Sequence, residues 1–578
     1  MAIQTPTPPR SRSSGRAFQD QLALQVALGT PELPVEPHDA EHGAVFTRRW
    51  VVELILDLAG YTTDQRLDQL TAVEPACGDG AFLVPMVERL SVVCKQHGVS
   101  LREAEGSIRA FDLQAHSVEA SRAAVAGALA SAGWGVAEAR SFAVSSIKQS
   151  DFLLSEHVYG EVDFVLGNPP YVRLEAVPPT RGQAYRRACP TMSGRADIYV
   201  GFFEVGLKAL KSGGSLAFIC ADRWMRNQYG QRLRELIANH FSFEAAIEMH
   251  DVDAFVDEVS AYPSIVVIRN RGQQPVLVAK TTANFDASHA ERMVRWHASA
   301  RADEQDHTPT YRASVLSGWF PGTSSWPSGS PARLAVLRDL ESRFPALEDE
   351  ATGTRVGIGV ATGADRVFVT TDSAVAEPQH MLPLAMAADT MTGELAWSGH
   401  YLVNPWRDDG AGLVDLDESP RLRCYYEEHQ QQLLGRNVAK RQPAAWYRTI
   451  DRVDPGLTRQ HKLLFPDIKA AIHPVLDTGQ TYPHHNLYFV VSKQWELEVL
   501  GGLLLSRVAQ LFVEAYAVRM RGGYLRFQAQ YLRRIRVPRL ADVDEIRAER
   551  LRCAFRDRNV EAATATALEL YELTELPD

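Results

Sequence analysis

Two patterns of apolar residues alternate along the first half of the chain. Short continuous apolar runs, as in residues 162–167, predict buried strands. Between such runs, apolar residues recur at helical spacing, as in residues 44–58, where Thr47 is placed to cap a helix and Gly60 to end it. From about residue 40 to 270 strands therefore alternate with helices, which predicts a doubly wound, mostly parallel α/β sheet covered on both faces.

The alternation ends near residue 270, and a second domain of different texture is expected beyond it. A stretch rich in Gly, Ser and Pro at residues 322–331 is typical of a domain boundary. Residues 356–369 predict two strands around a glycine-bearing bend, which favours a mixed α+β domain. A chain of 578 residues is too long for one ordinary core. We therefore expect a disordered tail, an α/β domain, a linker and a mixed α+β domain, at residues 1–35, 36–300, 301–335 and 336–578 respectively.

Composition narrows the class of protein. The chain has 45% hydrophobic and 23% charged residues, which is typical of a globular protein. It has no apolar run long enough to cross a bilayer and no apolar signal core, so we expect a cytoplasmic protein. The six cysteines are scattered without CxxC spacing, which favours reduced thiols over disulfides or a zinc site.

The charge is unevenly distributed. A net charge of −10 argues against a protein coated in nucleic acid, but it leaves room for a local basic cleft. Residues 519–539 carry seven arginines and no acid, with Tyr524, Phe527 and Tyr531 among them. Clustered arginines with aromatic residues are typical of a surface that binds phosphates and bases. An ordinary solvated basic face is the alternative interpretation.

The turn Asn168-Pro169-Pro170-Tyr171 is the strongest candidate for chemistry. Two prolines cannot continue the strand at residues 162–167, so they force a rigid turn at its carboxyl end, where ligands of α/β sheets usually bind. The Asn168 side chain and the Pro169 carbonyl offer two acceptors for an exocyclic amino group. The Tyr171 ring could stack on a planar base. The alternative is a plain Pro-Pro turn with a partly buried tyrosine.

Other candidate residues also follow predicted strands. Gly78 and Gly80 would let the backbone approach a ligand closely, but their spacing fits neither a dinucleotide fingerprint nor a phosphate loop. Asp112 ends the second strand, where an acid commonly holds the ribose of an adenosine-containing cofactor. Asp151, next to Phe152, could meet the amino edge and the face of an adenine. For both acids a helix cap remains the alternative.

These motifs, taken in order, resemble those of a known family. Phe46-Thr47, the loop at residues 74–80, Asp112, Asp151-Phe152 and the turn at 168–171 precede a basic C-terminal half. This order is similar to that of the S-adenosylmethionine-dependent N6-adenine DNA methyltransferases of type II restriction–modification systems, in the gamma class of the TaqI methylase. Residues 357–364 also look like the opening of recognition domains in related methylases.

The resemblance implies a Rossmann-like catalytic domain, a C-terminal target-recognition domain, and roles for single residues. The target amino group would be held by Asn168 and Pro169, with Tyr171 stacked on the flipped base. The cofactor would be bound by Thr47, Glu74, Ala76, Gly78, Gly80, Asp112, Leu113, Asp151, Phe152 and Phe202. The DNA would contact Phe255, Arg436, Lys440, Arg441, Arg519, Arg521, Arg526 and Arg533.

Within that family the expected partners are double-stranded DNA and a cognate restriction endonuclease on a separate chain, and we expect a monomer. No metal is required: His38 and His42 fit a chance pairing, and His250, His484 and His485 surface or structural roles.

Three other readings of the motifs remain. The same turn occurs in methyltransferases of RNA bases and of protein glutamines, which usually lack a large basic domain. A catalytically silent DNA-binding protein is the second, against which the glycine loop argues. A fused nuclease is disfavoured by the few residues before Phe46.

Overall fold

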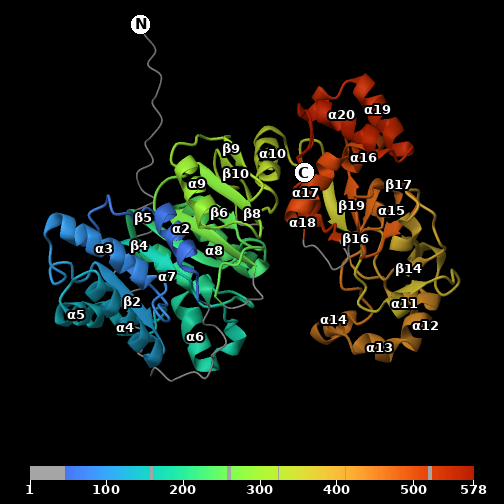
Figure 1. Cartoon of the computed structure of the whole chain (residues 1–578). Helices are drawn as coiled ribbons and strands as arrows, with labels where there is room; N and C mark the ends of the chain where they lie inside the picture. Colours follow the sequence, from blue (N-terminus) through green and yellow to red (C-terminus); the bar gives the residue numbers. More distant parts are fainter. Residues whose placement is uncertain are drawn as a thin grey trace, which may run out of the picture. The chain divides into compact units, whose positions relative to one another are not determined.

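The computed structural model describes residues 46–155, 160–256, 262–322, 325–409, 412–517 and 524–577. The predicted tail, residues 1–35, and the candidates Arg519 and Arg521 lie outside the described residues. The chain forms two compact units, Met1–Ser325 and Trp326–Asp578 (Figure 1).

The first unit is built on a ten-stranded sheet with the order β3-β2-β1-β4-β5-β7-β6-β8-β10-β9. Neighbouring strands from β3 to β5 are parallel, and β7 lies antiparallel between β5 and β6. The predicted doubly wound, mostly parallel sheet is thus confirmed. The strands are β1 (Ala72–Glu74), β2 (Ile108–Asp112), β3 (Ile147–Gln149), β4 (Val162–Gly167), β5 (Leu210–Ala221), β6 (Ser242–Glu248), β7 (Pro263–Arg269), β8 (Val276–Thr281), β9 (Gln305–His307) and β10 (Tyr311–Leu316).

Helices cover both faces of this sheet. Phe164 of β4 meets Tyr61, which follows α2, with ring centroids 5.3 Å apart, while its neighbour Val165 faces Gly206 of α7. Successive strand residues point to opposite faces, so α2 and α7 lie on opposite sides. The helices are α2 (Arg49–Ala59), α3 (Leu83–His97), α4 (Ala115–Ser131), α5 (Val136–Ser146), α6 (Pro179–Ala188), α7 (Tyr199–Ala209), α8 (Gln231–His240) and α9 (Ala287–His297).

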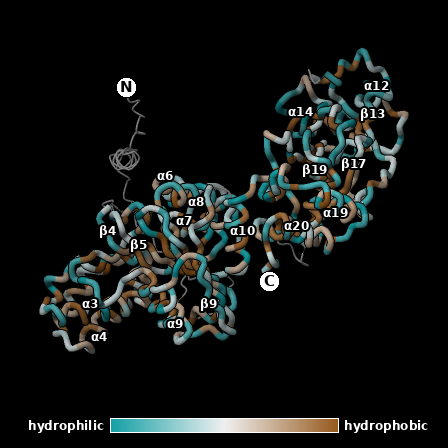
Figure 2. Tube along the Cα trace, turned by 90° about the horizontal axis from the view of Figure 1, so that it is seen from above, coloured by the Kyte–Doolittle hydropathy of each residue, from teal (hydrophilic) through white to brown (hydrophobic). Residues whose placement is uncertain are grey.

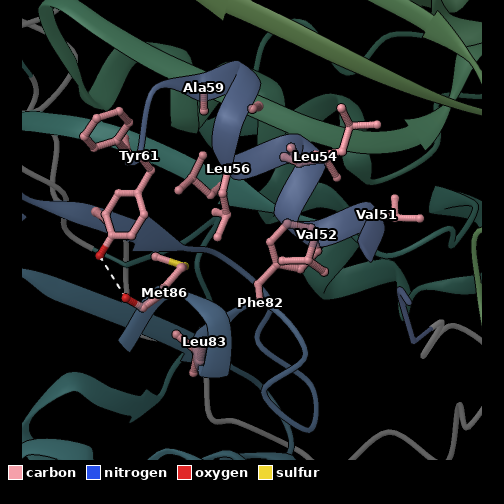
Figure 3. Packing of buried hydrophobic residues seen from close by; sticks show 14 of the residues in the cluster. Val51, Val52, Leu54, Leu56, Ala59, Tyr61, Phe82, Leu83 and Met86 are labelled. Atoms are coloured by element: carbon pink, nitrogen blue, oxygen red, sulfur yellow. Dashed lines mark hydrogen bonds between the residues drawn. The ribbon is translucent and has the colours of Figure 1, made fainter. Parts of the chain in front are cut away.

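The core on the α2 side joins α2 to α3. Figure 3 shows Val52, Leu56 and Phe82 packed together, with the Tyr61 hydroxyl donating to the Met86 carbonyl at 3.4 Å. Gly60 ends α2 in the left-handed region, at φ 85°, as predicted.

Thr47 does not cap α2, contrary to the prediction. Arg48 is the residue before the helix and makes no side-chain cap bond. Thr47 instead forms an extended bridge with Phe255, and its hydroxyl accepts a hydrogen bond from the Asn168 amide at 3.3 Å. A tertiary contact has therefore displaced the local capping role.

The second unit has the predicted mixed α+β character. Its sheets have the orders β11-β19-β15-β17, β12-β14-β13-β18 and β16-β20, and brown apolar segments run through both units in Figure 2. The strands are β11 (Arg355–Ile358), β12 (Val369–Thr370), β13 (Met381–Ala385), β14 (Tyr401–Val403), β15 (His461–Pro466), β16 (Ile468–Lys469), β17 (Val475–Thr478), β18 (Tyr482–Pro483), β19 (Leu487–Val491) and β20 (Leu525–Arg526).

Helices surround these sheets in sequence order. They are α10 (Pro331–Arg343), α11 (Asp365–Phe368), α12 (Pro420–Glu428), α13 (Gln430–Leu434), α14 (Asn437–Arg441), α15 (Gly456–Arg459), α16 (Leu497–Leu505), α17 (Arg507–Tyr516), α18 (Ala529–Leu532), α19 (Glu545–Arg556) and α20 (Val560–Tyr571). Among the described residues no single helix is long and apolar enough to cross a membrane; α16 and α17 meet that test only as a pair bent by 63°.

The predicted linker, residues 301–335, differs from the structure. It contains β9 and β10, which extend the sheet of the first unit, and the first turn of α10. The units divide after Ser325, inside the Gly/Ser/Pro-rich stretch. The edge strand β9 carries no apolar residue, so the sequence offered no strand pattern there.

We expect Gly206→Ala to lower the free energy of unfolding of the first unit by about 1–3 kcal/mol. The added methyl would lie 2.9 Å from Leu216 Cδ1 and 3.1 Å from Val165 Cγ1. Gly127→Ala in α4 is the matched control, because nothing lies within 4 Å of its methyl and alanine favours a helix by up to about 1 kcal/mol. Urea unfolding followed by circular dichroism measures both; equal shifts would contradict the close packing of α7.

Candidate active site

A cavity of about 210 Å³ opens at the carboxyl ends of β1, β2 and β4. The strand order reverses here, since β1 lies between β2 and β4, and such a reversal leaves a crevice for ligands. The sequence-predicted residues that line it are Thr47, Glu74, Ala76, Gly78, Asp112, Leu113, Asp151, Phe152, Asn168 and Phe202. Predicted candidates from six separate segments therefore converge on one cavity.

The glycine loop after β1 is held by hydrogen bonds to β2 and α4. Asp112 accepts from the Gly78 N–H at 3.0 Å and from the Gln114 N–H at 2.8 Å, and the Ser121 hydroxyl donates to the Gly78 carbonyl at 2.6 Å. Gly78 and Gly80 both have positive φ, 51° and 92°. Gly80 does not line the cavity; a Cβ there would lie 3.4 Å from Ser121 Oγ.

Glu74 is a buried acid at the end of β1. Its side chain is 2% exposed, and Oε2 has no hydrogen-bond partner among the described residues. Burial, and then the charge of Asp112, raise the pKa of Glu74. A buried acceptor beside a cavity favours a ligand that brings N–H donors or positive charge.

Aromatic rings form one wall. The Phe152 and Phe202 rings stack with centroids 5.6 Å apart and planes 19° apart, and Phe111 contacts Phe152 at 5.7 Å. Leu113 lies on the same cavity. This wall is apolar and flat, as a planar heterocycle requires.

Asp151 lies on the cavity with both carboxylate oxygens engaged. Oδ1 accepts from the Leu153 N–H at 3.0 Å, and Oδ2 accepts from the Tyr185 hydroxyl at 2.8 Å. Arg181 Nε lies 3.9 Å from Oδ2. Burial raises the pKa of Asp151, whereas the Tyr185 hydrogen bond and the Arg181 charge lower it.

Arg181 and Tyr185 were not predicted from the sequence. Both lie on α6 and line the cavity. They are four residues apart, so they share one helix face. That spacing, in a helix shortly after the Pro-Pro turn, is the signal that could have identified them.

The Pro-Pro turn borders the same cavity through Asn168 and Pro170. Tyr171 does not line it: its hydroxyl donates to the Ile219 carbonyl at 3.4 Å, and burial raises its pKa. The Tyr171 ring meets Phe255 edge to face at 6.3 Å. The predicted stacking of these two rings on a base stays a prediction, because in this arrangement the rings contact each other.

The basic candidates of the second unit differ in their surroundings. Arg436 donates to the carbonyls of Thr362 and Trp446, at 3.0 and 2.8 Å, and burial lowers its pKa. Arg526 pairs with Asp467, and Arg533 pairs with Glu348 at 2.9 Å. Lys440 and Arg441 are exposed on α14. The structure thus gives Arg436 a scaffolding role that the sequence did not predict.

His484 is part of a hydrogen-bonded group. Its Nε2 lies 3.2 Å from Asp365 Oδ2, and its Nδ1 lies 2.9 Å from Asn486 Oδ1. With His485, the nearest donor atoms of this group all lie within 4.8 Å of one another. The contacts join α11 to the turn after β18. His38 and His42 lie outside the described residues.

Comparison with known families accounts for both units. Residues 108–255 match the Eco57I restriction-modification methylase family, and residues 421–537 match the TaqI-like C-terminal specificity domain. Fold and comparison together define the class: a Rossmann-like methyltransferase sheet followed by a specificity domain.

Individual relatives match almost the whole chain. The type II methyltransferase M.PaeR7I of Pseudomonas aeruginosa is 43% identical over 95% of both chains. M.XhoI of Xanthomonas vasicola is 40% identical over 93% of this chain and 98% of its own, and M.BstVI of Geobacillus stearothermophilus 37% over 92% and 96%. The chain belongs to the type II DNA methyltransferases of restriction–modification systems. Among solved structures, the type IIL restriction-modification enzyme MmeI in complex with DNA covers 92% of this chain and 74% of its own, with 12% identity and a TM-score of 0.45.

We expect Arg436→Gln to lower the free energy of unfolding of the second unit by about 1–3 kcal/mol, because two backbone carbonyls lose their donor. Lys440→Gln removes the same charge from an exposed position on α14 and is the matched control. Thermal unfolding followed by circular dichroism measures both variants. A stable Arg436→Gln variant would count against the scaffolding role and make this arginine a candidate for DNA binding again.

Proposed function

We propose that this enzyme transfers a methyl group from S-adenosylmethionine to the N6 amino group of an adenine within a short duplex DNA site. The observation that carries the proposal is that Asn168 of the Asn-Pro-Pro-Tyr turn and Gly78 of the glycine loop line one cavity. The turn offers acceptors suited to an amino group, and the loop offers a close approach to a cofactor.

The residues on the cavity fit this cofactor. The Phe152–Phe202 wall and Leu113 suit an adenine ring, and Asp112 retains acceptor lone pairs for ribose hydroxyls. The partnerless Glu74 Oε2 suits the ammonium group of the methionine end. When bound, the cofactor supplies an electrophilic methyl group on a sulfonium centre.

The protein's own residues prepare the target base. An adenine inside a duplex hides its amino group, so it must be flipped out at a cost of a few kcal/mol. The Asn168 side chain and the Pro169 carbonyl would accept the two amino hydrogens, which orients the nitrogen and concentrates electron density on it. Stacking on Tyr171 would return about 1–3 kcal/mol, once the Tyr171 and Phe255 rings move apart.

The two units divide the work in this proposal. The first unit carries the methyl transfer, and the second unit, matched by the specificity domain, reads the DNA sequence. Protection of host DNA from a separate restriction endonuclease is the biological role, and a cytoplasmic monomer is the expected state. Family membership favours DNA over RNA or protein as the substrate.

Mapping of N6-methyladenine in the DNA of cells that express the chain tests the proposal. We expect one short sequence to be methylated on adenine at nearly every occurrence, and the same sites to stay unmethylated in cells without the gene. Methylation of cytosine, or no modified base at all, would refute it.

We expect Asn168→Ala to lower the rate of methyl transfer about 10²–10³-fold, because a preorganised acceptor for the amino group is removed. Binding of DNA and of S-adenosylhomocysteine should change little. Single-turnover transfer of a tritiated methyl group measures the rate. Thr47→Val, which removes the hydroxyl that accepts from the Asn168 amide, should give a smaller loss that Thr47→Ser avoids. Full activity of Asn168→Ala would overturn the assigned role.

We expect the double variant Lys440→Gln, Arg441→Gln to bind duplex DNA more weakly, with a slope of log K against log salt reduced by about 1.8, since each phosphate that is no longer neutralised lowers the slope by about 0.9. Fluorescence anisotropy at several salt concentrations measures the slope. Arg547→Gln, Arg550→Gln removes two charges from α19, where they pair with Glu569, and is the matched control. Identical slopes for both double variants would argue against DNA binding at α14.

A further inference from the structure

The helix that follows the Pro-Pro turn places two polar residues against the cofactor cavity. Arg181 and Tyr185 of α6 are 7% and 3% exposed, although most of this helix is polar and exposed. Burying a guanidinium is costly unless a nearby charge or acceptor offsets it. Both side chains are directed to the same group, the Asp151 carboxylate.

The geometry fixes that carboxylate. One oxygen accepts from the Leu153 N–H at 3.0 Å and the other from the Tyr185 hydroxyl at 2.8 Å, so rotation about the last side-chain bond would break both hydrogen bonds. Each oxygen keeps a further lone pair, and Asp151 lies on the cavity. The lone pairs that remain face the ligand as acceptors only.

The protonation state decides what Asp151 can recognise. An ionised carboxylate only accepts hydrogen bonds, which suits a 6-amino purine; a protonated carboxyl also donates, which suits a 6-oxo purine. Burial raises the pKa of Asp151 and so favours the protonated form, while Tyr185 and Arg181 oppose this shift. Cys189, just after α6, is a further titratable group in electrostatic contact with Asp151.

We propose that Tyr185 and Arg181 are positioning residues that keep Asp151 a hydrogen-bond acceptor and thereby make the enzyme select a cofactor carrying adenine over one carrying hypoxanthine. The proposal rests on the function proposed above, in which Asp151 meets the amino group of the cofactor's adenine. Neither residue touches the reacting atoms; each acts through Asp151.

Isothermal titration of the full chain with S-adenosylhomocysteine and with S-inosylhomocysteine tests this. We expect the wild type to prefer the adenosine compound strongly. Tyr185→Phe and Arg181→Gln should bind it about threefold to tenfold more weakly and should lose most of the preference. Arg181→Lys, which keeps the charge, should recover much of it.

The pH dependence adds a readout that a packing role would not move. Removing either donor raises the pKa of Asp151 further, so the acceptor form is lost at a higher pH as the solution is acidified. We therefore expect binding of S-adenosylhomocysteine to fall off at higher pH in Tyr185→Phe and Arg181→Gln than in the wild type. Tyr311→Phe is the matched control, because it removes the same hydroxyl from a hydrogen bond to Asp306 on β9.

The outcomes separate the two proposals. If the wild type binds no S-adenosylhomocysteine, the proposed function itself fails. If the wild type binds it, and folded variants keep the wild-type preference and pH profile, only the role of α6 is overturned. Two chemically different variants are used so that a fold defect in one leaves the other to decide.

Discussion

The two prolines at the end of β4 are the constraint on which the site depends. Pro169 and Pro170 have no N–H with which to continue a ladder, so the chain must turn away beside β1, where the strand order reverses. Gly167 brings the turn close to the loop after β1, since a Cβ there would lie 3.3 Å from Pro75. The amide of Asn168 is then held by Thr47. Backbone geometry alone thus brings the turn and the glycine loop to one cavity.

The cavity is otherwise a collection of buried acids. Burial raises the pKa of Glu74, Asp112 and Asp151 alike. An acid whose pKa is raised by folding lowers the stability of the fold as pH rises through the range between its unfolded and folded values. A ligand with N–H donors and a positive charge offsets that cost, because it favours the ionised forms. Ligand binding therefore stabilises the site, and the same acids discriminate against anions.

Much of the fold could be predicted from the sequence, and less of the contacts. The alternation of apolar runs and helical spacing indicated the parallel sheet, because both signals are local. Thr47, β9 and Arg436 were misjudged because tertiary contacts decide them: a bond to Asn168, pairing at a polar sheet edge, and two distant carbonyls. The cavity residues converged as the motif order predicted, but Tyr185 and Arg181 act through a partner that no local pattern reveals.

The segment from the turn through α6 joins the two halves of the site. Its beginning carries Asn168 and Tyr171, and its end carries Arg181 and Tyr185, which hold Asp151. The start of the segment is also tied by backbone bonds to the chain before α7: Leu174 donates to Ala196, and Ile198 donates to Val172. A base can stack on Tyr171 only if that ring separates from Phe255, which moves the start of the segment. Binding of base and cofactor must then be coupled in free energy, and by linkage the coupling is equal in both directions.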